Sequence, residues 1–167
     1  MNRENGFTLV ELIVTLAIAA LLMTVAVPSF MTTIKNNRLI TDANRLVSSV
    51  GLARSEAIKQ GRTATVCVSA DQATCTGETD WTLGWMVWVD VNGNAAFDAG
   101  EERGFAAAFP GNGVTFTSGA SQIQFTPQGA ATAAATLDLC DDRAGETGRR
   151  INVSNTGRAS TTNLGCA

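Results

Sequence analysis

The sequence contains no histidine and no tyrosine, and the first absence narrows the functions open to it. Without histidine, the chain can have neither a histidine-dependent catalytic triad nor a histidine-ligated metal site. The sequence also offers no nucleophile beside a base, no phosphate-binding loop and no carboxylate pair in a defined cleft. We therefore expect that the chain is not an enzyme.

Basic residues are scarce as well. The chain has 12 Lys and Arg against 15 Asp and Glu, which gives a net charge of −3. A generic nucleic-acid-binding domain is normally basic, so this balance disfavours that class. A length of 167 residues suits one globular domain plus an anchor.

The first thirty residues carry the strongest signal. Residues 1–6 (MNRENG) are polar, whereas residues 7–30 (FTLVELIVTLAIAALLMTVAVPSF) are apolar except for the single charge of Glu11. About 20 apolar residues are enough to cross a bilayer. A secretory signal would instead have a basic region and a shorter apolar stretch before a small-residue cleavage site. The run therefore predicts a transmembrane helix and not a secretory signal.

Glu11 separates two interpretations of this run. A plain membrane anchor explains its length and apolar character, but not a carboxylate near one end. A charge at mid-bilayer costs about 2.5–3.5 kcal/mol on insertion scales, so such a residue usually has a partner and a function. In a packed helical core the carboxylate needs a cation or hydrogen-bond donors. We therefore favour a subunit whose apolar helix packs against those of its neighbours.

The segment GFTLVE, residues 6–11, closely resembles the processing site of type IV pilins and type II secretion pseudopilins. The resemblance implies that a prepilin peptidase cleaves between Gly6 and Phe7 and that the new Phe7 amine is methylated. Residues 1–6 are then a leader peptide, and residues 7–30 are the transmembrane part of the N-terminal helix. We expect the Glu11 carboxylate to pair with the Phe7 amine of a neighbouring subunit and to fix the axial register.

Beyond the apolar run, the pattern becomes that of an amphipathic helix over residues 31–60. Apolar residues recur at steps of four and three, which places them on one helical face. Pro28 should kink or loosen the helix, and Gly61 should end it. Arg54 and Glu56 are expected to face solvent or to form local salt bridges. The apolar face consists of Leu39, Ala43, Leu46, Val50, Ala53 and Ala57.

After Gly61, β-branched residues and turn signals predict short strands. Trp85 and Trp88 are three apart, so they should face opposite sides of one strand. A long helix followed by short strands predicts an α+β fold with antiparallel sheets packed on the amphipathic half of the helix. The expected strands are residues 63–69, 83–90, 105–109, 114–117, 122–126, 135–140 and 150–154.

All four cysteines follow the apolar run: Cys67, Cys75, Cys140 and Cys166. Their even number downstream of an export signal predicts disulfides in an oxidising compartment. Their spacing matches neither a zinc ribbon nor a C-x-x-C redox motif. Of the three pairings that four cysteines allow, we favour two. Cys67–Cys75 closes a short polar loop, and Cys140–Cys166 ties down the C-terminal tail.

Three further segments resemble the FimT/FimU/GspH group of minor pilins and pseudopilins. They are LARSEAI at residues 52–58, WTLGWMVWVDVNGN at residues 81–94 and CDDRAG at residues 140–145. With the N-terminal motif, the likeness covers nearly the whole chain, though residues 105–136 match only loosely. The resemblance implies a type IV pilin-like fold, with residues 31–167 as a periplasmic domain.

The segment DVNGNAAFDAGE, residues 90–101, has two interpretations. Its oxygen-bearing residues Asp90, Asn92, Asn94, Asp98 and Glu101 match positions one, three, five, nine and twelve of an EF-hand-like calcium loop. However, Ala95 stands where the loop normally has glycine, and the flanks read as strands. The alternative is a hairpin turn rich in glycine and asparagine, with no cofactor bound.

A C-terminal group of arginines raises the question of DNA. Some FimT-like minor pilins are DNA receptors for natural transformation and carry a G-R-x-R motif. Here the matching segment is GRAS, so the resemblance transfers to Arg158 but not to Ser160. Arg149 and Arg150 are the other candidate contacts. Because so few phosphates could be neutralised, we expect binding to DNA to be weak or absent.

These observations converge on a structural subunit. We expect a minor pilin of a type IV pilus that primes assembly or caps the tip. The alternatives are an H-type minor pseudopilin of a type II secretion system and a displayed DNA receptor. The expected partners are other pilin or pseudopilin subunits, a prepilin peptidase and an inner-membrane assembly platform. The expected location is the inner membrane, with a single pass and a periplasmic C-terminal domain, followed by the filament.

Overall fold

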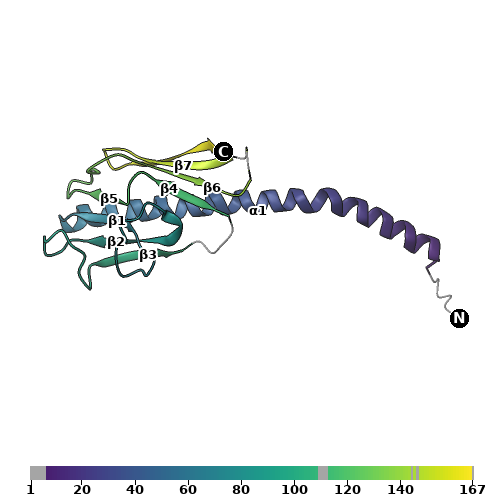
Figure 1. The fold of residues 1–167 in the computed structure, drawn as a ribbon, viewed down its shortest axis with the longest axis horizontal. Helices are drawn as coiled ribbons and strands as arrows, with labels where there is room; N and C mark the ends of the chain where they lie inside the picture. Colours follow the sequence, from purple (N-terminus) through teal and green to yellow (C-terminus); the bar gives the residue numbers. More distant parts are fainter. Residues whose placement is uncertain (1–6, 109–112, 144, 146, 167) are drawn as a thin grey trace. The chain divides into compact units, whose positions relative to one another are not determined.

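The structure, a computed structural model, describes residues 7–108, 113–143, 145 and 147–166. Within these residues, one long helix, α1 (Leu9–Gln60), is followed by eight strands, and a 3-10 turn, η1 (Trp81–Leu83), lies between the first two strands (Figure 1). The chain divides into two compact units, Met1–Arg38 and Leu39–Ala167. The first unit contains the start of α1, and the second contains the rest of α1 and all the strands.

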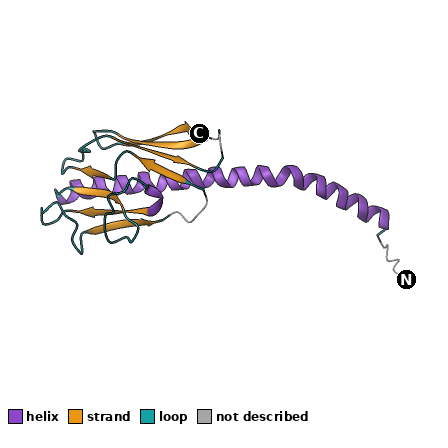
Figure 2. Cartoon of the chain, in the orientation of Figure 1, coloured by secondary structure: helices purple, strands orange, loops and turns teal. Residues whose placement is uncertain are grey.

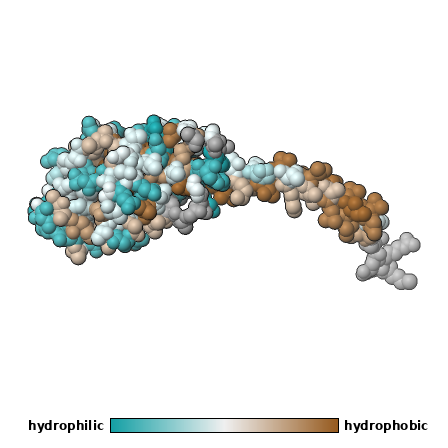
Figure 3. Space-filling view, in the orientation of Figure 1, coloured by the Kyte–Doolittle hydropathy of each residue, from teal (hydrophilic) through white to brown (hydrophobic). Residues whose placement is uncertain are grey.

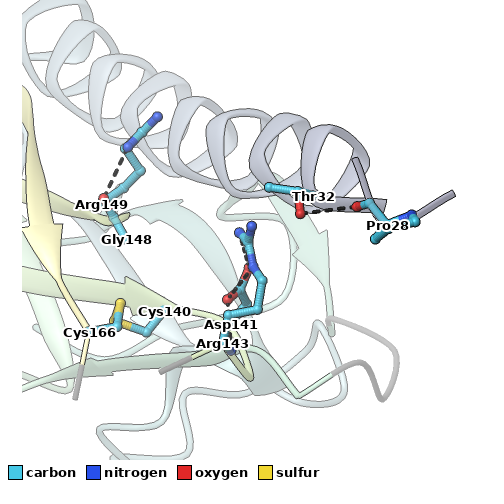
Figure 4. Close-up of polar contacts among 8 residues, drawn as sticks. All are labelled: Pro28, Thr32, Cys140, Asp141, Arg143, Gly148, Arg149 and Cys166. Carbon is cyan, nitrogen blue, oxygen red and sulfur yellow. Dashed lines mark hydrogen bonds and ion pairs between the residues drawn. A yellow bond between two sulfur atoms is a disulfide. The ribbon is translucent and has the colours of Figure 1, made fainter. Parts of the chain in front are cut away.

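In the first unit, the apolar side chains of α1 are exposed along its length. Phe7, just before α1, and Leu9 and Leu21 within it keep more than 70% of their surface exposed, and apolar colouring gathers toward the N-terminal end of the helix (Figure 3). The helix continues through Pro28, where the Thr32 hydroxyl donates to the Pro28 carbonyl at 3.2 Å (Figure 4). By length and composition, α1 could cross a membrane.

In the second unit, α1 buries one face. Its buried residues are the six predicted from the spacing: Leu39, Ala43, Leu46, Val50, Ala53 and Ala57. The helix ends at Gln60, where Gly61 adopts a φ of +62° and the Arg62 N–H reaches the Ala57 carbonyl. Glycine is favoured here because the left-handed conformation strains residues that have a Cβ atom.

The strands form two antiparallel four-stranded sheets (Figure 2). Sheet A has the order β3-β2-β1-β5, and sheet B has the order β4-β6-β7-β8. Buried residues of α1 and of both sheets make one continuous core. The α+β fold class is therefore confirmed. Sheet A consists of β1 (Ala64–Val68), β2 (Gly84–Val89), β3 (Glu102–Ala107) and β5 (Gln122–Phe125); sheet B consists of β4 (Thr115–Ser118), β6 (Ala135–Cys140), β7 (Thr147–Val153) and β8 (Ala159–Gly165).

Five strands match the expected ranges to within one residue at each end, and three do not. Strand β3 starts at Glu102 instead of 105, and β7 starts at Thr147 instead of 150. Strand β8 was not predicted, because its sequence ASTTNLG is mostly polar. It is an edge strand, and its residues are mostly exposed, so the ladder with β7 forms it without an alternating apolar pattern.

The tryptophans of β2 lie on opposite faces of sheet A, as predicted. Trp85 belongs to the main core, and its indole N–H donates to the Ser49 hydroxyl of α1 at 2.9 Å. Trp88 belongs to a smaller cluster on the other face, with Cys67, Met86 and Phe97. Both faces of β2 are therefore covered, which explains why all six of its residues are buried.

Candidate functional site

The N-terminal motif begins α1. The Glu11 N–H donates to the Thr8 hydroxyl at 3.2 Å, so Thr8 caps the helix and Glu11 lies in its first turn. Threonine followed three residues later by glutamate is the capping-box pattern. A carboxylate in this position also favours the positive end of the helix dipole. The sequence interpretation missed this local role. The predicted cleavage partner Gly6 lies outside the described residues.

The cysteines form two disulfides, Cys67–Cys75 and Cys140–Cys166, which are the pairs favoured from the sequence. The first links β1 to the loop that follows it. The second links the end of β6 to the end of β8 (Figure 4). A Cβ atom at Gly148 of β7 would collide with the Cys166 sulfur and with the Leu139 carbonyl at 2.5 Å. The second disulfide therefore needs glycine at this position.

Next to it, Arg143 folds back onto Asp141. The Arg143 Nε donates to both Asp141 carboxylate oxygens, at 3.1 and 2.9 Å, and Nη2 donates at 2.6 Å (Figure 4). Both side chains are largely buried. This pair lies within the CDDRAG segment, so Asp141 and Arg143 have a local structural role there.

The predicted calcium loop is a turn held by its own hydrogen bonds. The Asp90 carboxylate accepts the backbone N–H groups of Gly93, Asn94 and Ala95, at 2.7, 3.1 and 2.9 Å. The Glu101 carboxylate accepts the N–H of Val91 at 2.7 Å and that of Asp98 at 3.0 Å. Ala95 adopts a φ of +60°, the conformation for which glycine is preferred.

The remaining polar groups of this loop are also paired. Asp98 accepts the side-chain amides of Asn92 and Asn94, each at 2.7 Å. Within the described ranges, no three Asp, Glu or Cys side chains are placed to hold a metal ion together. The five predicted ligands do lie in one loop, but the hydrogen bonding favours the turn interpretation. Calcium binding stays a prediction.

The three candidate DNA-binding arginines have different surroundings. Arg150 forms a two-point pair with Asp138, with Nε and Nη2 at 2.7 and 2.8 Å from the carboxylate oxygens. This pair lowers the pKa of the Asp138 carboxyl and raises that of Arg150. The Arg149 guanidinium donates to the Asn163 side chain at 2.8 Å. Within the described part of the chain, Arg158 has no side-chain partner. The charge available for phosphates is therefore smaller than the sequence suggests.

Arg54 differs most from its prediction. Instead of facing solvent, it is half-buried, and its Nε donates to the Gly129 carbonyl at 2.9 Å. A Cβ atom at Gly157 would collide with that carbonyl and lie 3.2 Å from the Arg54 Nε. The LARSEAI segment thus meets the turn before β8 at this point. Periodicity could not indicate this contact, because its partners are 75 residues apart in the sequence.

Comparison with known proteins supplies the family. A family model described as "Type II transport protein GspH" matches residues 42–157, which is more than half of the chain. The chain belongs to the GspH family. A second model, described as "Prokaryotic N-terminal methylation motif", matches residues 1–27.

Individual relatives agree with this family. The Pilin-like protein PilA1 of Thermus thermophilus is 30% identical over 165 residues, which is 93% of this chain and 97% of that protein. The type IV minor pilin FimU of Pseudomonas aeruginosa has a similar fold, with a TM-score of 0.58 and 20% identity over 77% of this chain and 90% of FimU. The minor pseudopilin EpsH of the Vibrio cholerae type 2 secretion system gives a TM-score of 0.50 and 14% identity over 74% and 94%.

Membership of the GspH family makes the chain a minor pilin or pseudopilin. Proteins of this family are structural subunits and not enzymes. The family implies that the chain associates with other pilin subunits in a filament. Together with the exposed apolar start of α1, it indicates anchoring in a membrane.

Proposed function

We propose that this GspH-family chain is a minor pilin of a type IV pilus, which primes filament assembly or caps the tip. Before assembly, its N-terminal helix holds it in the inner membrane, with residues 31–167 in the periplasm. The two disulfides support this location, because disulfides persist in oxidising compartments. An assembly platform in the same membrane then transfers the subunit into the filament.

Processing precedes assembly in this proposal. A prepilin peptidase removes residues 1–6 by cleaving after Gly6, and the amine of Phe7 is methylated. The match of residues 1–27 to the N-terminal methylation motif supports this step. Mass spectrometry of the filament-bound protein should find an N-terminus at methylated Phe7. A mature chain that begins at any other residue would contradict the proposal.

One observation carries the proposal: Glu11 is the only charged residue among residues 7–30, whose apolar side chains are exposed. Within the described residues, its carboxylate has no hydrogen-bond partner. Exposed apolar surface of this extent needs lipid or other helices to cover it. In a bundle of such helices, the carboxylate needs a cation, and the Phe7 amine of a neighbouring subunit can supply one.

The capping geometry provides a matched pair of variants. Glu11→Gln keeps a side chain that can complete the capping box but removes the charge, whereas Thr8→Ala removes the cap and keeps the charge. We expect Glu11→Gln to lower the amount of protein in sheared filaments by about tenfold or more, since leaving the partner charge unpaired costs more than 1.4 kcal/mol. Thr8→Ala should change it less than about twofold.

Immunoblots of filament and membrane fractions measure this difference. Both variants should be present in the membrane at the wild-type level. If Glu11→Gln entered filaments as well as wild type, charge pairing at Glu11 would have to be abandoned.

The second candidate is an H-type minor pseudopilin of a type II secretion system, the class of protein named in the description of the matching family model. Deleting the gene in its host separates the two functions. Loss of surface pili with normal export of folded proteins supports the pilus, and the reverse result supports secretion.

Calcium binding is one of the two interpretations of residues 90–101, and it can be tested separately. If Asp90, Asn92, Asn94, Asp98 and Glu101 bind calcium, adding the ion should raise the melting temperature of the wild type, and Asp98→Ala should abolish the increase. An unchanged melting temperature would leave the loop as a turn held by its own hydrogen bonds.

A further inference from the structure

A groove lies between the second half of α1 and the turn that leads into β8. Its volume is about 350 Å³, and its apolar lining includes Val47, Val50 and Ile58 of α1. Arg54 and Arg158 also line it. No acidic side chain is among the described residues that form the groove. In a chain whose net charge is −3, two cations without a neighbouring acid favour an anionic partner.

The groove is held in place by backbone contacts. The Arg54 Nε donates to the Gly129 carbonyl at 2.9 Å, which orients the guanidinium and leaves its terminal nitrogens available. The Arg158 N–H donates to the Ser154 hydroxyl at 3.3 Å, and the Arg158 carbonyl accepts the Ser154 N–H at 3.0 Å. Neither guanidinium has another hydrogen-bond or ion-pair partner within the described residues. This arrangement suits a carboxylate that stands beside an apolar side chain.

Elsewhere on its surface, the chain itself has a carboxylate beside an exposed apolar side chain. Residues 63–102 contain seven Asp and Glu residues and no Lys or Arg. Directly after them, Phe105 is 66% exposed on β3, the edge strand of sheet A. Exposed apolar side chains on an edge strand favour association with another chain.

A β-bulge determines which side chains of this edge strand share a face. Val87 pairs with Gly104, but the next residue, Trp88, pairs with Glu102, so Arg103 is the extra residue. The Arg103 guanidinium lies 3.8 Å from the Glu56 carboxylate of α1. Its Nη1 also donates to the Gly100 and Glu102 carbonyls, at 3.0 and 2.9 Å, and its charge helps to lower the pKa of the Glu102 carboxyl, which keeps that carboxyl ionised.

The register places the two remaining side chains on that outer face. Phe105 pairs with Met86, and Glu102 pairs with Trp88, and both partners belong to the outer cluster of sheet A. Cross-strand partners direct their side chains to the same face of a sheet. We call Glu102 and Phe105 the β3 ridge, and we call the pocket lined by Arg54 and Arg158 the arginine groove.

We propose that the β3 ridge of one copy docks into the arginine groove of a second copy of this chain. The Phe105 ring packs against Val47, Ile58 and the face of the Arg54 guanidinium, which combines apolar burial with a cation–π contact. The Glu102 carboxylate forms a charge-assisted pair with Arg158.

Ridge and groove are different patches, so the contact is head-to-tail and can repeat from copy to copy. This inference deepens the proposed function and rests on it, because it identifies a surface by which a filament subunit associates with its own kind. DNA suits the groove less well, because two cations neutralise few phosphates and the rest of the lining is largely apolar.

A photo-crosslink tests the contact in the full chain. Two differently tagged copies are purified in detergent, and one carries benzoylphenylalanine at position 105. We expect a covalent product between the two tags on illumination. Mass spectrometry should place the crosslink in peptides that contain residues 47–58 or 157–159. A crosslink to any other surface would overturn the proposal.

Charge reversal adds a second readout. Arg158→Glu and Glu102→Arg should each reduce the crosslinked fraction at least about fivefold, and the two changes together, one in each copy, should restore at least half of it. Arg62→Glu and Glu78→Arg are matched controls, because both residues are exposed and neither belongs to the ridge or the groove. If a reversal lowers the melting temperature, Arg158→Gln and Glu102→Gln replace it. Each single variant should then reduce the crosslinked fraction, and the two variants together should reduce it by less than the sum of the two single effects.

Two results would contradict the proposal. The first is crosslinking that does not respond to either charge reversal. The second is loss of crosslinking on addition of a short DNA duplex whose binding depends on Arg158, since the groove would then be a nucleic-acid site. Filament entry is measured separately. A chain that enters filaments without this crosslink refutes the inference alone, and a chain that crosslinks but never enters filaments refutes the proposed function alone.

Discussion

Two glycines allow the loops around Arg54 to approach each other closely. Gly129 offers its carbonyl to the Arg54 side chain, and Gly157 lies so near that a Cβ atom would collide with the same carbonyl. Gly157 also has a φ of +74°, which strains any residue with a Cβ atom. Gly61 has a similar φ of +62° but open space around it, which makes it a control for backbone strain alone.

We expect Gly157→Ala to lower the free energy of unfolding by about 3 kcal/mol or more, and Gly61→Ala by about 1 kcal/mol. The difference reports the collision with the Gly129 carbonyl. Chemical unfolding of the full chain in detergent measures both values. Equal losses in the two variants would show that the loops can separate without cost.

The pair between Asp138 and Arg150 makes stability depend on pH. Hydrogen bonding and the nearby positive charge of Arg150 lower the pKa of the Asp138 carboxyl in the folded state. The stabilisation is therefore complete above the unfolded pKa, about 3.9, and is lost as pH falls through the lowered folded value. We expect Asp138→Asn to be less stable than wild type at neutral pH and to approach it at the acid end of this window.

Glu78→Gln is the control for removal of a carboxylate charge. Within the described residues, the Glu78 carboxylate accepts no hydrogen bond, so this variant should be as stable as wild type at neutral pH, where Asp138→Asn is less stable. A constant gap between wild type and Asp138→Asn from pH 7 down to pH 2 would contradict the assigned pair.

At the residue scale, sequence reasoning worked where chemistry is local. The buried face of α1 follows from the spacing of its apolar residues, and the two favoured disulfide pairs are the ones that form. It failed for Arg54, whose contact depends on how the turns before β6 and β8 pack on the helix. It also overestimated the charge available on β7, because the partner of Arg150 lies on the neighbouring strand.

The disulfides act at the scale of the elements. Cys67–Cys75 joins residues eight apart, and Cys140–Cys166 joins residues 26 apart and fastens the edge strand β8. In the loop-entropy model, the longer loop gives the larger stabilisation. We expect the double serine variant at Cys140 and Cys166 to lose about 3.5 kcal/mol, and that at Cys67 and Cys75 about 2.5 kcal/mol.

Unfolding with urea under oxidising conditions gives these losses. Hydrogen exchange shows which strand each disulfide stabilises. The amides of β8 should lose protection in the Cys140/Cys166 variant and keep it in the Cys67/Cys75 variant. If both variants exchanged alike along β8, the second disulfide would not be what holds that strand.

The elements also show why some boundaries escaped prediction. Strand β3 extends back to Glu102 because the bulge opposite Val87 and Trp88 lets polar residues join the ladder. Strand β8 forms on the edge of sheet B, where backbone pairing with β7 suffices and side chains can stay polar. In both cases the partner strand, rather than the local sequence, determines where the strand lies.

At the scale of the whole molecule, the second unit depends on α1 for its core. Six α1 side chains have no more than 1% of their surface exposed, and they contact both sheets within one cluster. Burying Leu39, Leu46 and Val50 alone contributes about 6 kcal/mol, which is comparable to the entire stability of a typical domain. By contrast, none of the apolar residues described between Phe7 and Arg38 belongs to this cluster.

Two truncations test this division. A fragment of residues 39–167 should fold in water without detergent and unfold cooperatively, with a midpoint close to that of the full chain, because it keeps every residue of the cluster. A fragment of residues 62–167 keeps all the strands and both disulfides but should not fold, since the faces of both sheets that pack on α1 would be exposed. Circular dichroism and urea unfolding distinguish the two results. Cooperative unfolding of the shorter fragment would show that the sheets form a core without the helix, and failure of the longer one would show that stability depends on residues before Leu39.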